Sequence, residues 1–289
     1  MSLPKTSVYF SVVIPCLNEE EYLPRLLHNL SRQTYRHFEV YVVDGSSEDN
    51  TPSLVTDYPA NYPLKLITTT KRNVSYQRNL GAHQSSGPVL VFFDADTQIP
   101  KNFLEKIHHA FETKRPHLLT TWMAADSHRA ADQLVATGSN LLIEIGRIVG
   151  VVGSFGAMIA IKRGVFDDIG GFDEQTKFSE DRQIVQTAVD YNYQFIILQK
   201  PKFIYSLRRF RSEGTLEALL DSIRANLEIA SNGFHTEKIN YPMGGQAFAS
   251  PAKIPPSLRW TTKLLTKLKK TTKEQQQTIR RLTDFFQFR

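Results

Sequence analysis

An apolar run, Val89–Phe93, ends directly at the carboxylates of Asp94 and Asp96, and this junction constrains the fold more than any other feature of the chain. Branched and aromatic residues in so short a run predict a buried strand. Two carboxylates at its end are costly to bury without a counter-charge. Acidic side chains at the carboxyl end of a sheet strand usually face a ligand crevice, where a divalent cation holding a diphosphate would neutralise both. The alternative for this pattern alone is a solvated turn.

Apolar runs of this kind alternate with helical segments along the chain. Strands are predicted at residues 11–15, 38–43, 64–68, 89–93, 158–161 and 193–198, and a further segment, 118–123, is left unassigned. Apolar positions recurring at helical spacing, or capping residues, predict intervening helices at residues 22–30, 51 onward, 75–84, 102–112, 132 onward, 163–169 and 179–189. We expect Asn18 to cap the first helix. Such alternation predicts an α/β fold with a mostly parallel sheet flanked by helices.

The positive charge of the chain is concentrated near its C-terminus. Residues 251–289 hold ten Lys or Arg and two acidic residues, a net +8, whereas the whole chain carries +6. The preceding 250 residues therefore carry a net −2, which argues against nucleic-acid binding. Residues 241–257 are rich in Pro, Gly and Ala and predict a linker. We expect a main domain over 1–240, this linker, and a helical basic tail over 258–289.

Several protein classes are excluded by single residues or short segments. One cysteine, Cys16, allows neither an internal disulfide framework nor a cysteine-rich zinc site. The first residues are too few and too polar for a signal peptide. No apolar run reaches the roughly 18 to 20 residues of a membrane span. A cytoplasmic location is therefore expected.

Four polar clusters fall where predicted strands end or predicted helices begin. They are Asn18-Glu19, Asp44-Gly45-Ser46, Asp94-Ala95-Asp96 and Glu180-Asp181. These positions share one edge of a parallel sheet, so we expect the clusters to meet at a single site. For Glu180 and Asp181 the alternative is simple helix capping. A helix N-terminus favours an anion, so we expect a low pKa for Asp181.

These segments, in this order, resemble family 2 glycosyltransferases of the GT-A fold over about residues 8–210. The matching segments are 13–20, 42–51, 78–82, 93–97, 170–174 and 179–181. The resemblance implies a mixed GT-A-type sheet and a hexosyltransferase activity. It also implies transfer of a sugar from a UDP- or GDP-sugar to an acceptor hydroxyl, with inversion and with Mn²⁺ or Mg²⁺ as cofactor. The acceptor would be a surface polysaccharide, glycolipid or lipid-linked glycan of the cell envelope.

The resemblance also assigns donor-binding roles to matching residues. Asp44 would accept a hydrogen bond from the nucleotide base, and Arg78 would lie near the diphosphate. The full nucleotide-sugar set is Pro15, Leu17, Glu19, Asp44, Ser46, Arg78, Asp94 and Ala95.

Metal and catalytic roles fall on the other acidic residues. Asp96 would coordinate the metal, and Asp94 would face the ribose or a metal-bound water. Asp181, beside Glu180, would be the general base that deprotonates the acceptor hydroxyl. The cation would stabilise the charge that builds on the leaving diphosphate.

A second group of predictions concerns the acceptor and the diphosphate. Arg208, Arg209 and Arg211 surround one aromatic residue and can clamp a diphosphate or an anionic acceptor. The alternative is a solvated loop. Gly156, in a glycine-rich stretch, predicts a loop that faces the acceptor closely. The Gln-x-x-Arg-Trp motif of processive members is not found in the sequence, which argues against a polymerising synthase.

The basic tail carries two apolar stripes, within residues 260–268 and 279–286, that are flanked by Lys and Arg. Such stripes are typical of helices on an anionic membrane surface. We expect peripheral association with the inner face of the plasma membrane. The alternatives are packing on the main domain or a dimer contact.

Two other functions compete with this interpretation. A sugar nucleotidyltransferase usually carries a glycine-rich loop with Arg and Lys after the first strand, where this chain has residues 16–19, Cys-Leu-Asn-Glu. An inactive nucleotide-sugar-binding or scaffold protein would not need both Asp96 and Asp181. The sequence therefore favours an inverting glycosyltransferase with its catalytic domain in residues 1–240.

Overall fold

The computed structural model describes residues 8–148, 152, 154, 156–176, 179–208 and 211. The chain divides into two units, Met1–Ser250 and Pro251–Arg289, and every described residue belongs to the first. The predicted linker (241–257) and basic tail (258–289) lie outside the described residues. Among the helices that are described, none is both long and apolar enough to span a membrane.

The described residues form one seven-stranded sheet with the order β3-β2-β1-β4-β6-β5-β7. Its strands are β1 (Phe10–Cys16), β2 (Phe38–Asp44), β3 (Leu64–Thr68), β4 (Val89–Phe93), β5 (Leu118–Ala125), β6 (Met158–Lys162) and β7 (Phe195–Tyr205). Strand β6 is antiparallel to both of its neighbours, β4 and β5, and the remaining pairs are parallel. The predicted α/β fold with a mostly parallel, mixed sheet is confirmed.

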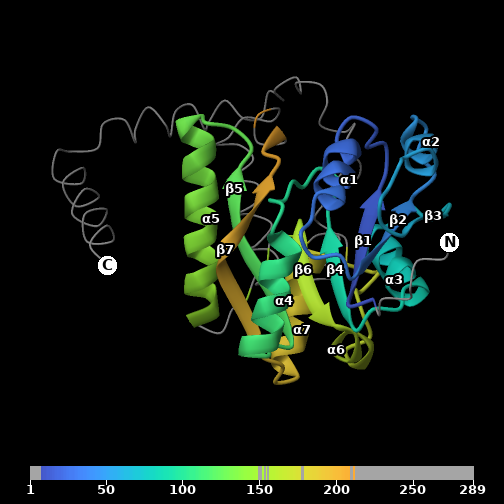
Figure 1. Ribbon diagram of the computed structural model, residues 1–289. Helices are drawn as coiled ribbons and strands as arrows, with labels where there is room; N and C mark the ends of the chain where they lie inside the picture. The colour runs from blue at the N-terminus through green and yellow to red at the C-terminus, as the bar shows by residue number, and fades with distance from the viewer. Residues whose placement is uncertain are drawn as a thin grey trace. The chain divides into compact units, whose positions relative to one another are not determined.

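Helices cover both faces of this sheet (Figure 1). They are α1 (Leu23–Ser31), α2 (Thr51–Thr56), α3 (Val74–Gln84), α4 (Phe103–Lys114), α5 (Ala130–Ile148), α6 (Arg163–Asp168) and α7 (Glu180–Asp190). Because successive strand residues point to opposite faces, Val12 and Ile14 of β1 pack in one core with α1 and α4. Val13 packs in the other core, with α3, α6 and α7. The result is a three-layer arrangement.

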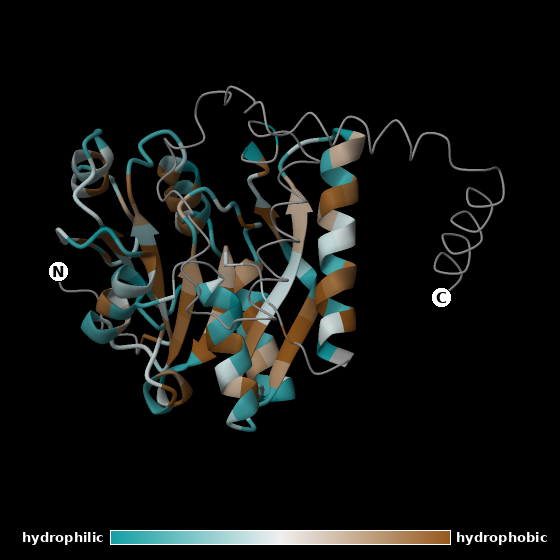
Figure 2. Ribbon diagram, turned by 180° about the vertical axis from the view of Figure 1, so that it is seen from behind, coloured by the Kyte–Doolittle hydropathy of each residue, from teal (hydrophilic) through white to brown (hydrophobic). Residues whose placement is uncertain are grey.

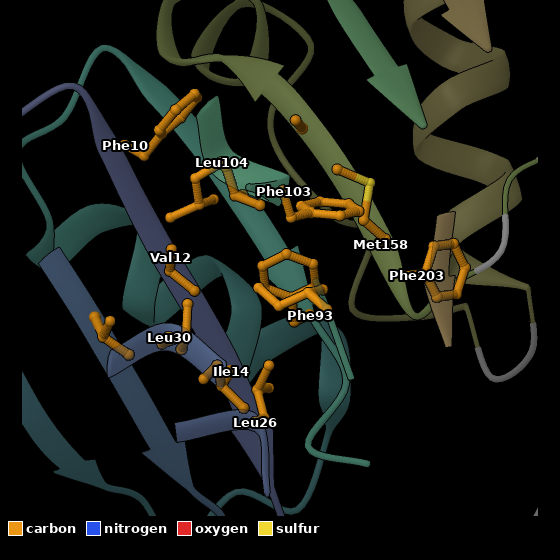
Figure 3. Close-up of a cluster of buried hydrophobic side chains, with 14 of the residues drawn as sticks. Phe10, Val12, Ile14, Leu26, Leu30, Phe93, Phe103, Leu104, Met158 and Phe203 are labelled. Carbon is orange, nitrogen blue, oxygen red and sulfur yellow. The ribbon is translucent and has the colours of Figure 1, made fainter. Parts of the chain in front are cut away.

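The larger core lies between the sheet and helices α1 and α4 (Figure 3). Leu26 and Leu30 of α1 meet the β1 side chains, while Phe103 of α4 packs edge-on against Phe93 with ring centroids 5.7 Å apart. Each such side chain contributes about 1.5–3 kcal/mol when fully buried. The central strands are correspondingly apolar, whereas hydrophilic residues lie along the surrounding helices and loops (Figure 2). This packing fixes the ends of β1 and β4.

Two local predictions are wrong in ways that shape the site. Asn18 does not cap α1, which begins only at Leu23. Asn18 adopts a left-handed conformation with φ 56°, and its side-chain oxygen accepts a hydrogen bond from the Glu48 N–H at 2.7 Å. Asparagine tolerates this conformation better than most residues. Its side chain is therefore used to join two loops and is not available to the helix.

Strand β7 is longer than predicted and continues past residue 198 to Tyr205. Beyond a register shift opposite Thr121 and Met123 it stays paired with β5. Near its end, Ile204 and Gln98 exchange both backbone hydrogen bonds, at 2.8 and 3.1 Å. Gln98 lies two residues after Asp96, so this bridge brings the chain that follows β7 to the end of β4.

Candidate active site

The loops that follow β1 and β2 are joined by hydrogen bonds. The Asn18 N–H donates to Ser47 Oγ at 2.8 Å, and the Glu19 N–H donates to Thr51 Oγ1 at 2.9 Å. From α3, the buried amide of Gln77 donates to the carbonyl oxygens of Cys16 and Val43, at 2.9 and 3.2 Å. These bonds hold the carboxyl ends of the two strands in register.

The predicted base-recognition residue, Asp44, lies at the end of β2 and is fully buried. Both of its carboxylate oxygens accept hydrogen bonds from Ser47, one from the backbone N–H at 2.9 Å and one from the hydroxyl. Ser46 has φ 59° and donates from its hydroxyl to the Thr69 carbonyl at 3.0 Å. Pro15 and Ala95 are buried and Leu17 is half-buried. The turn after β2 is thus tightly held.

Arg208, just beyond β7, bridges two of the predicted acidic residues. Its Nη2 lies 3.0 and 3.2 Å from the two carboxylate oxygens of Glu19 and 3.2 Å from Asp96 Oδ2. The guanidinium carbon lies 4.1 Å from the centre of the Tyr22 ring, a cation–π contact. The guanidinium of Arg208 therefore holds together residues from three separate segments of the chain.

Arg78 of α3 forms a second bridge and is only 1% exposed. Its guanidinium donates to Asp94 Oδ1 at 2.8 Å, to Glu180 Oε1 at 2.7 Å and to the Gly156 carbonyl at 3.3 Å. The Phe172 ring lies 5.1 Å from the guanidinium carbon. Arg78 thus connects the end of β4 with the first residue of α7.

Asp181, the predicted general base, is half-buried next to this bridge. Ser154 Oγ lies 3.4 Å from its Oδ2 and 3.2 Å from its backbone carbonyl. A Cβ added to Gly156 would lie 3.4 Å from the Asp181 Cβ and Cγ. Ser179 holds the N-cap position of α7, and the Glu180 carboxylate is bound to Arg78, so simple capping does not account for this pair.

The expectation of a low pKa for Asp181 is wrong. Burial raises the pKa of Asp181 to about 7, and the neighbouring Glu180 carboxylate raises it further against the opposing effect of Arg78. Removal from water and a like charge therefore outweigh the favourable field of the helix N-terminus. A carboxylate in this environment is suited to accept a proton near neutral pH.

The other acidic residues of the site are also perturbed. Burial raises the pKa of Asp96 to about 7, although Arg208 opposes the shift, and burial raises the pKa of Glu19 in the same way. Five carboxylates lie around the two guanidinium groups of Arg78 and Arg208, so acidic groups outnumber basic ones in the described part of the site. The carboxylates are those of Glu19, Asp94, Asp96, Glu180 and Asp181.

These residues fit a hard divalent cation such as Mg²⁺ or Mn²⁺, which prefers carboxylate oxygens. In the part of the chain that the structure describes, no group of three acidic, His or Cys side chains converges on one point. Mg²⁺ is commonly held by one or two carboxylates together with substrate phosphates and water. Asp96, with Asp94 nearby, fits that kind of site.

One of the predicted arginines, Arg211, contacts other acidic residues instead of this cluster. Arg211 donates to both oxygens of Asp126 at 2.7 Å and to Asp132, at the start of α5, at 3.0 Å. Arg209 lies outside the described residues. A cavity of about 410 Å³ beside residues 169–174 and α7 contains none of the predicted site residues in its lining.

Sequence reasoning missed Tyr22, Gln77 and Ser154 as members of this region. Tyr22 has a usable signal, because an aromatic residue follows Glu19 within one turn and can stack on a basic partner. Gln77 directly precedes Arg78 on the same helix. Ser154 has no comparable signal in the sequence, because its contact with Asp181 depends on the conformation of the loop that carries it.

Comparison with known proteins identifies the family of the chain. The family model described as "Glycosyl transferase family 2" matches residues 11–170, more than half of the chain. An uncharacterized glycosyltransferase of Haemophilus influenzae is 28% identical over 204 residues, which cover 67% of this chain and 63% of that protein. Poly(ribitol-phosphate) β-N-acetylglucosaminyltransferase TarS of Staphylococcus aureus is 35% identical over 100 residues, 33% of this chain and 18% of TarS. The matches thus span less than two thirds of these relatives.

Solved structures show the same fold. TarS residues 1–349, in complex with UDP-GlcNAc, align with a TM-score of 0.58 and 21% identity over 80% of this chain and 76% of that one. The mannosyltransferase PcManGT of Pyrobaculum calidifontis, in complex with GDP-Man and Mn²⁺, aligns with a TM-score of 0.59 and 21% identity over 76% and 66%. Because the family model matches more than half of its residues, the chain belongs to glycosyl transferase family 2.

Proposed function

We propose that this protein is an inverting, metal-dependent glycosyltransferase that uses a nucleoside-diphosphate sugar as donor. One observation supports the proposal: Arg78 binds both Asp94, at the predicted metal-binding end of β4, and Glu180, the chain neighbour of the predicted base Asp181. A single displacement needs a cation at the leaving group and a base at the nucleophile, held at a fixed separation.

On the donor side, the loops after β1 and β2 would bind the nucleotide, with Asp44, Ser46 and Glu19 at its edge. Asp96 would hold the cation, with Asp94 nearby. The cation would stabilise the negative charge that develops on the diphosphate. Structures of family relatives in complex with UDP-GlcNAc or with GDP-Man and Mn²⁺ support this class of donor.

On the acceptor side, Asp181 would take the proton from the attacking hydroxyl. The oxygen then forms its bond to the anomeric carbon as the bond to the diphosphate breaks, and this single displacement inverts the configuration. Burial raises the pKa of Asp181, which makes its carboxylate a stronger base than an ordinary aspartate. Gly156 leaves space next to this carboxylate.

The acceptor class follows from relatives and not from the site. TarS is named for the transfer of N-acetylglucosamine to poly(ribitol-phosphate). We therefore assign this chain to the assembly of a surface polysaccharide, glycolipid or lipid-linked glycan. The basic tail, residues 258–289, would hold it at an anionic membrane, and binding to anionic vesicles should weaken with salt.

The test compares Asp181→Asn with a matched exposed control, Asp168→Asn. Donor binding is measured by thermal shift with Mn²⁺ and UDP-GlcNAc or GDP-mannose, and transfer by release of the nucleoside diphosphate with a panel of glycan acceptors. Asp181→Asn should reduce transfer by about 10²–10⁴-fold, the scale of a lost general base, with donor binding unchanged. Undiminished transfer by Asp181→Asn would contradict the proposal. Release of inorganic pyrophosphate from a nucleoside triphosphate would instead identify a nucleotidyltransferase.

A further inference from the structure

Arg208 occupies an unusual position within the donor site. A single nitrogen, Nη2, lies within 3.2 Å of three carboxylate oxygens, two from Glu19 and one from Asp96. The side chains of Glu19, Asp96 and Arg208 are 11%, 14% and 16% exposed. Two carboxylates this deeply buried need a positive charge between them. In this structure Arg208 supplies the charge that a bound cation would otherwise bring.

The same guanidinium has an unused donor. Arg208 Nη1 is buried and has no hydrogen-bond partner among the described residues. A buried N–H without a partner is costly, and a guanidinium binds phosphate oxygens well because it presents several donors in a plane. The free nitrogen therefore points to an anionic group that completes the site when it binds.

The described part of the chain also offers few ligands for a free metal ion. No group of three metal-binding side chains converges within the described part of the chain. A cation that contacts Asp96 must also share that carboxylate with Arg208, whose positive charge opposes it. Among the described residues, a free cation thus meets few ligands and a like charge.

From these three observations we infer that Arg208 makes cation binding depend on the diphosphate. The guanidinium and the cation compete for Asp96. A nucleoside diphosphate supplies the missing metal ligands and attracts Arg208 to its own oxygens, so that Asp96 becomes free for the cation. This inference rests on the proposed function and adds a preference to it: the site binds the complex of metal and diphosphate more tightly than the free metal ion.

Thermodynamic linkage gives the inference a measurable form. If a diphosphate strengthens cation binding by some factor, the cation strengthens diphosphate binding by the same factor. Mn²⁺ binding to the full-length wild type is measured by electron paramagnetic resonance, without nucleotide and with saturating UDP or GDP in separate arms. After subtraction of Mn²⁺ bound to the nucleotide alone, Mn²⁺ should bind at least about tenfold more tightly with one of the two nucleotides.

The variant Arg208→Met removes the competing charge and keeps an apolar stem over Tyr22. Without nucleotide it should bind Mn²⁺ about tenfold more tightly than the wild type, and its coupling between Mn²⁺ and nucleotide should shrink. Lys202→Met, which removes one exposed positive charge six residues earlier, is the matched control and should bind free Mn²⁺ as the wild type does. Arg208→Lys keeps the positive charge and should bind free Mn²⁺ as weakly as the wild type. This variant tests the role of the charge if Arg208→Met does not fold.

Opposing outcomes are distinct. Equal Mn²⁺ affinity with and without nucleotide in the wild type, or equal free-metal affinity in the wild type and Arg208→Met, would overturn the inference and leave the proposed function intact. Full sugar transfer in excess EDTA would instead overturn the metal role on which the proposed function depends.

Discussion

The two arginine bridges of the site use the same chemistry in different surroundings. Arg78 is 1% exposed, belongs to helix α3, and is enclosed by Asp94, Glu180, the Gly156 carbonyl and Phe172. Arg208 lies beyond β7, and its side chain is 16% exposed, against 2% for the side chain of Arg78. Both join two carboxylates, but only Arg78 is enclosed by a helix and two loops.

This difference separates a fixed bridge from an exchangeable one. Removing a partner from a buried ion pair leaves an uncompensated charge, so the loss of Arg78 affects folding and catalysis together. Arg208 lies where an incoming cation or diphosphate can take over its contacts. Both bridges carry the same charge. How completely the guanidinium is enclosed decides whether the bridge has a fixed structural role or exchanges its contacts when a ligand binds.

Replacement of Arg78 should have the largest effect of the changes that test this contrast. Arg78→Met leaves Asp94 and Glu180 without a shared cation and should lower the free energy of unfolding by about 3–5 kcal/mol. Transfer should fall by more than about 10³-fold, because Arg78 no longer joins the predicted metal-binding end of β4 to the segment that carries the base Asp181. Urea unfolding and initial rates measure the two effects, and a variant as stable as wild type would contradict the fixed role.

The pH dependence should be the next largest effect, and it reports on the Arg78 side. The pKa of Asp181 is raised to about 7, and the base must be ionised, so kcat/KM should fall about tenfold per pH unit below that value and be flat above it.

The same shift predicts a stability effect of defined sign. A carboxyl whose pKa is raised by folding stabilises the protein at low pH, and this contribution is lost as pH rises from about 4 to 7. Asp181→Asn stays neutral, so it should be more stable than wild type by on the order of 1–3 kcal/mol at pH 8 and equally stable near pH 4. A stability difference independent of pH would show that Asp181 is not the titrating group.

Replacement of Arg208 should have a smaller effect on stability, and ligand should reverse it. Arg208→Met should lose about 1–3 kcal/mol of stability in EDTA, the range for a charge-assisted hydrogen bond. Mn²⁺ with UDP or GDP should restore most of that loss by mass action. Thermal unfolding with and without ligand measures both, and a loss that ligand leaves unchanged would place Arg208 in the same class as Arg78.

The sequence predicted the sheet edge better than it predicted the contacts made there. The rule that polar residues at strand ends share one edge anticipated that Asp94 would lie near Glu180, and Glu19 near Asp96. It could not assign the partners, because Arg208 reaches Asp96 only through the extended β7 and its bridge to Gln98. That pairing is tertiary and has no local signal.

The errors at Asn18 and Asp181 have a common cause. Both predictions rested on a helix N-terminus, one as a cap and the other as a favourable field. The Asn18 side chain instead bonds to the loop after β2, and burial beside Glu180 decides the pKa of Asp181. Local rules for helix ends were overridden wherever the chain was also part of a buried polar network.

The smallest expected effect comes from Gly156, whose carbonyl accepts a hydrogen bond from the fixed bridge and whose Cα faces the base. Its φ is not in the left-handed region, and an added Cβ would lie 3.4 Å from Asp181, an ordinary contact distance, so Gly156→Ala should fold normally.

The new methyl group would nevertheless lie next to the carboxylate that receives the acceptor proton. Gly156→Ala should raise the KM for the acceptor by about 10-fold or less, the scale of one misplaced methyl group, and leave donor binding unchanged. Gly164→Ala is the matched control, because its Cβ would meet nothing within 4 Å. Initial rates at varied acceptor and fixed donor concentration separate the two. A change confined to donor affinity would place Gly156 on the diphosphate side of the site and would move the acceptor away from the Arg78 bridge.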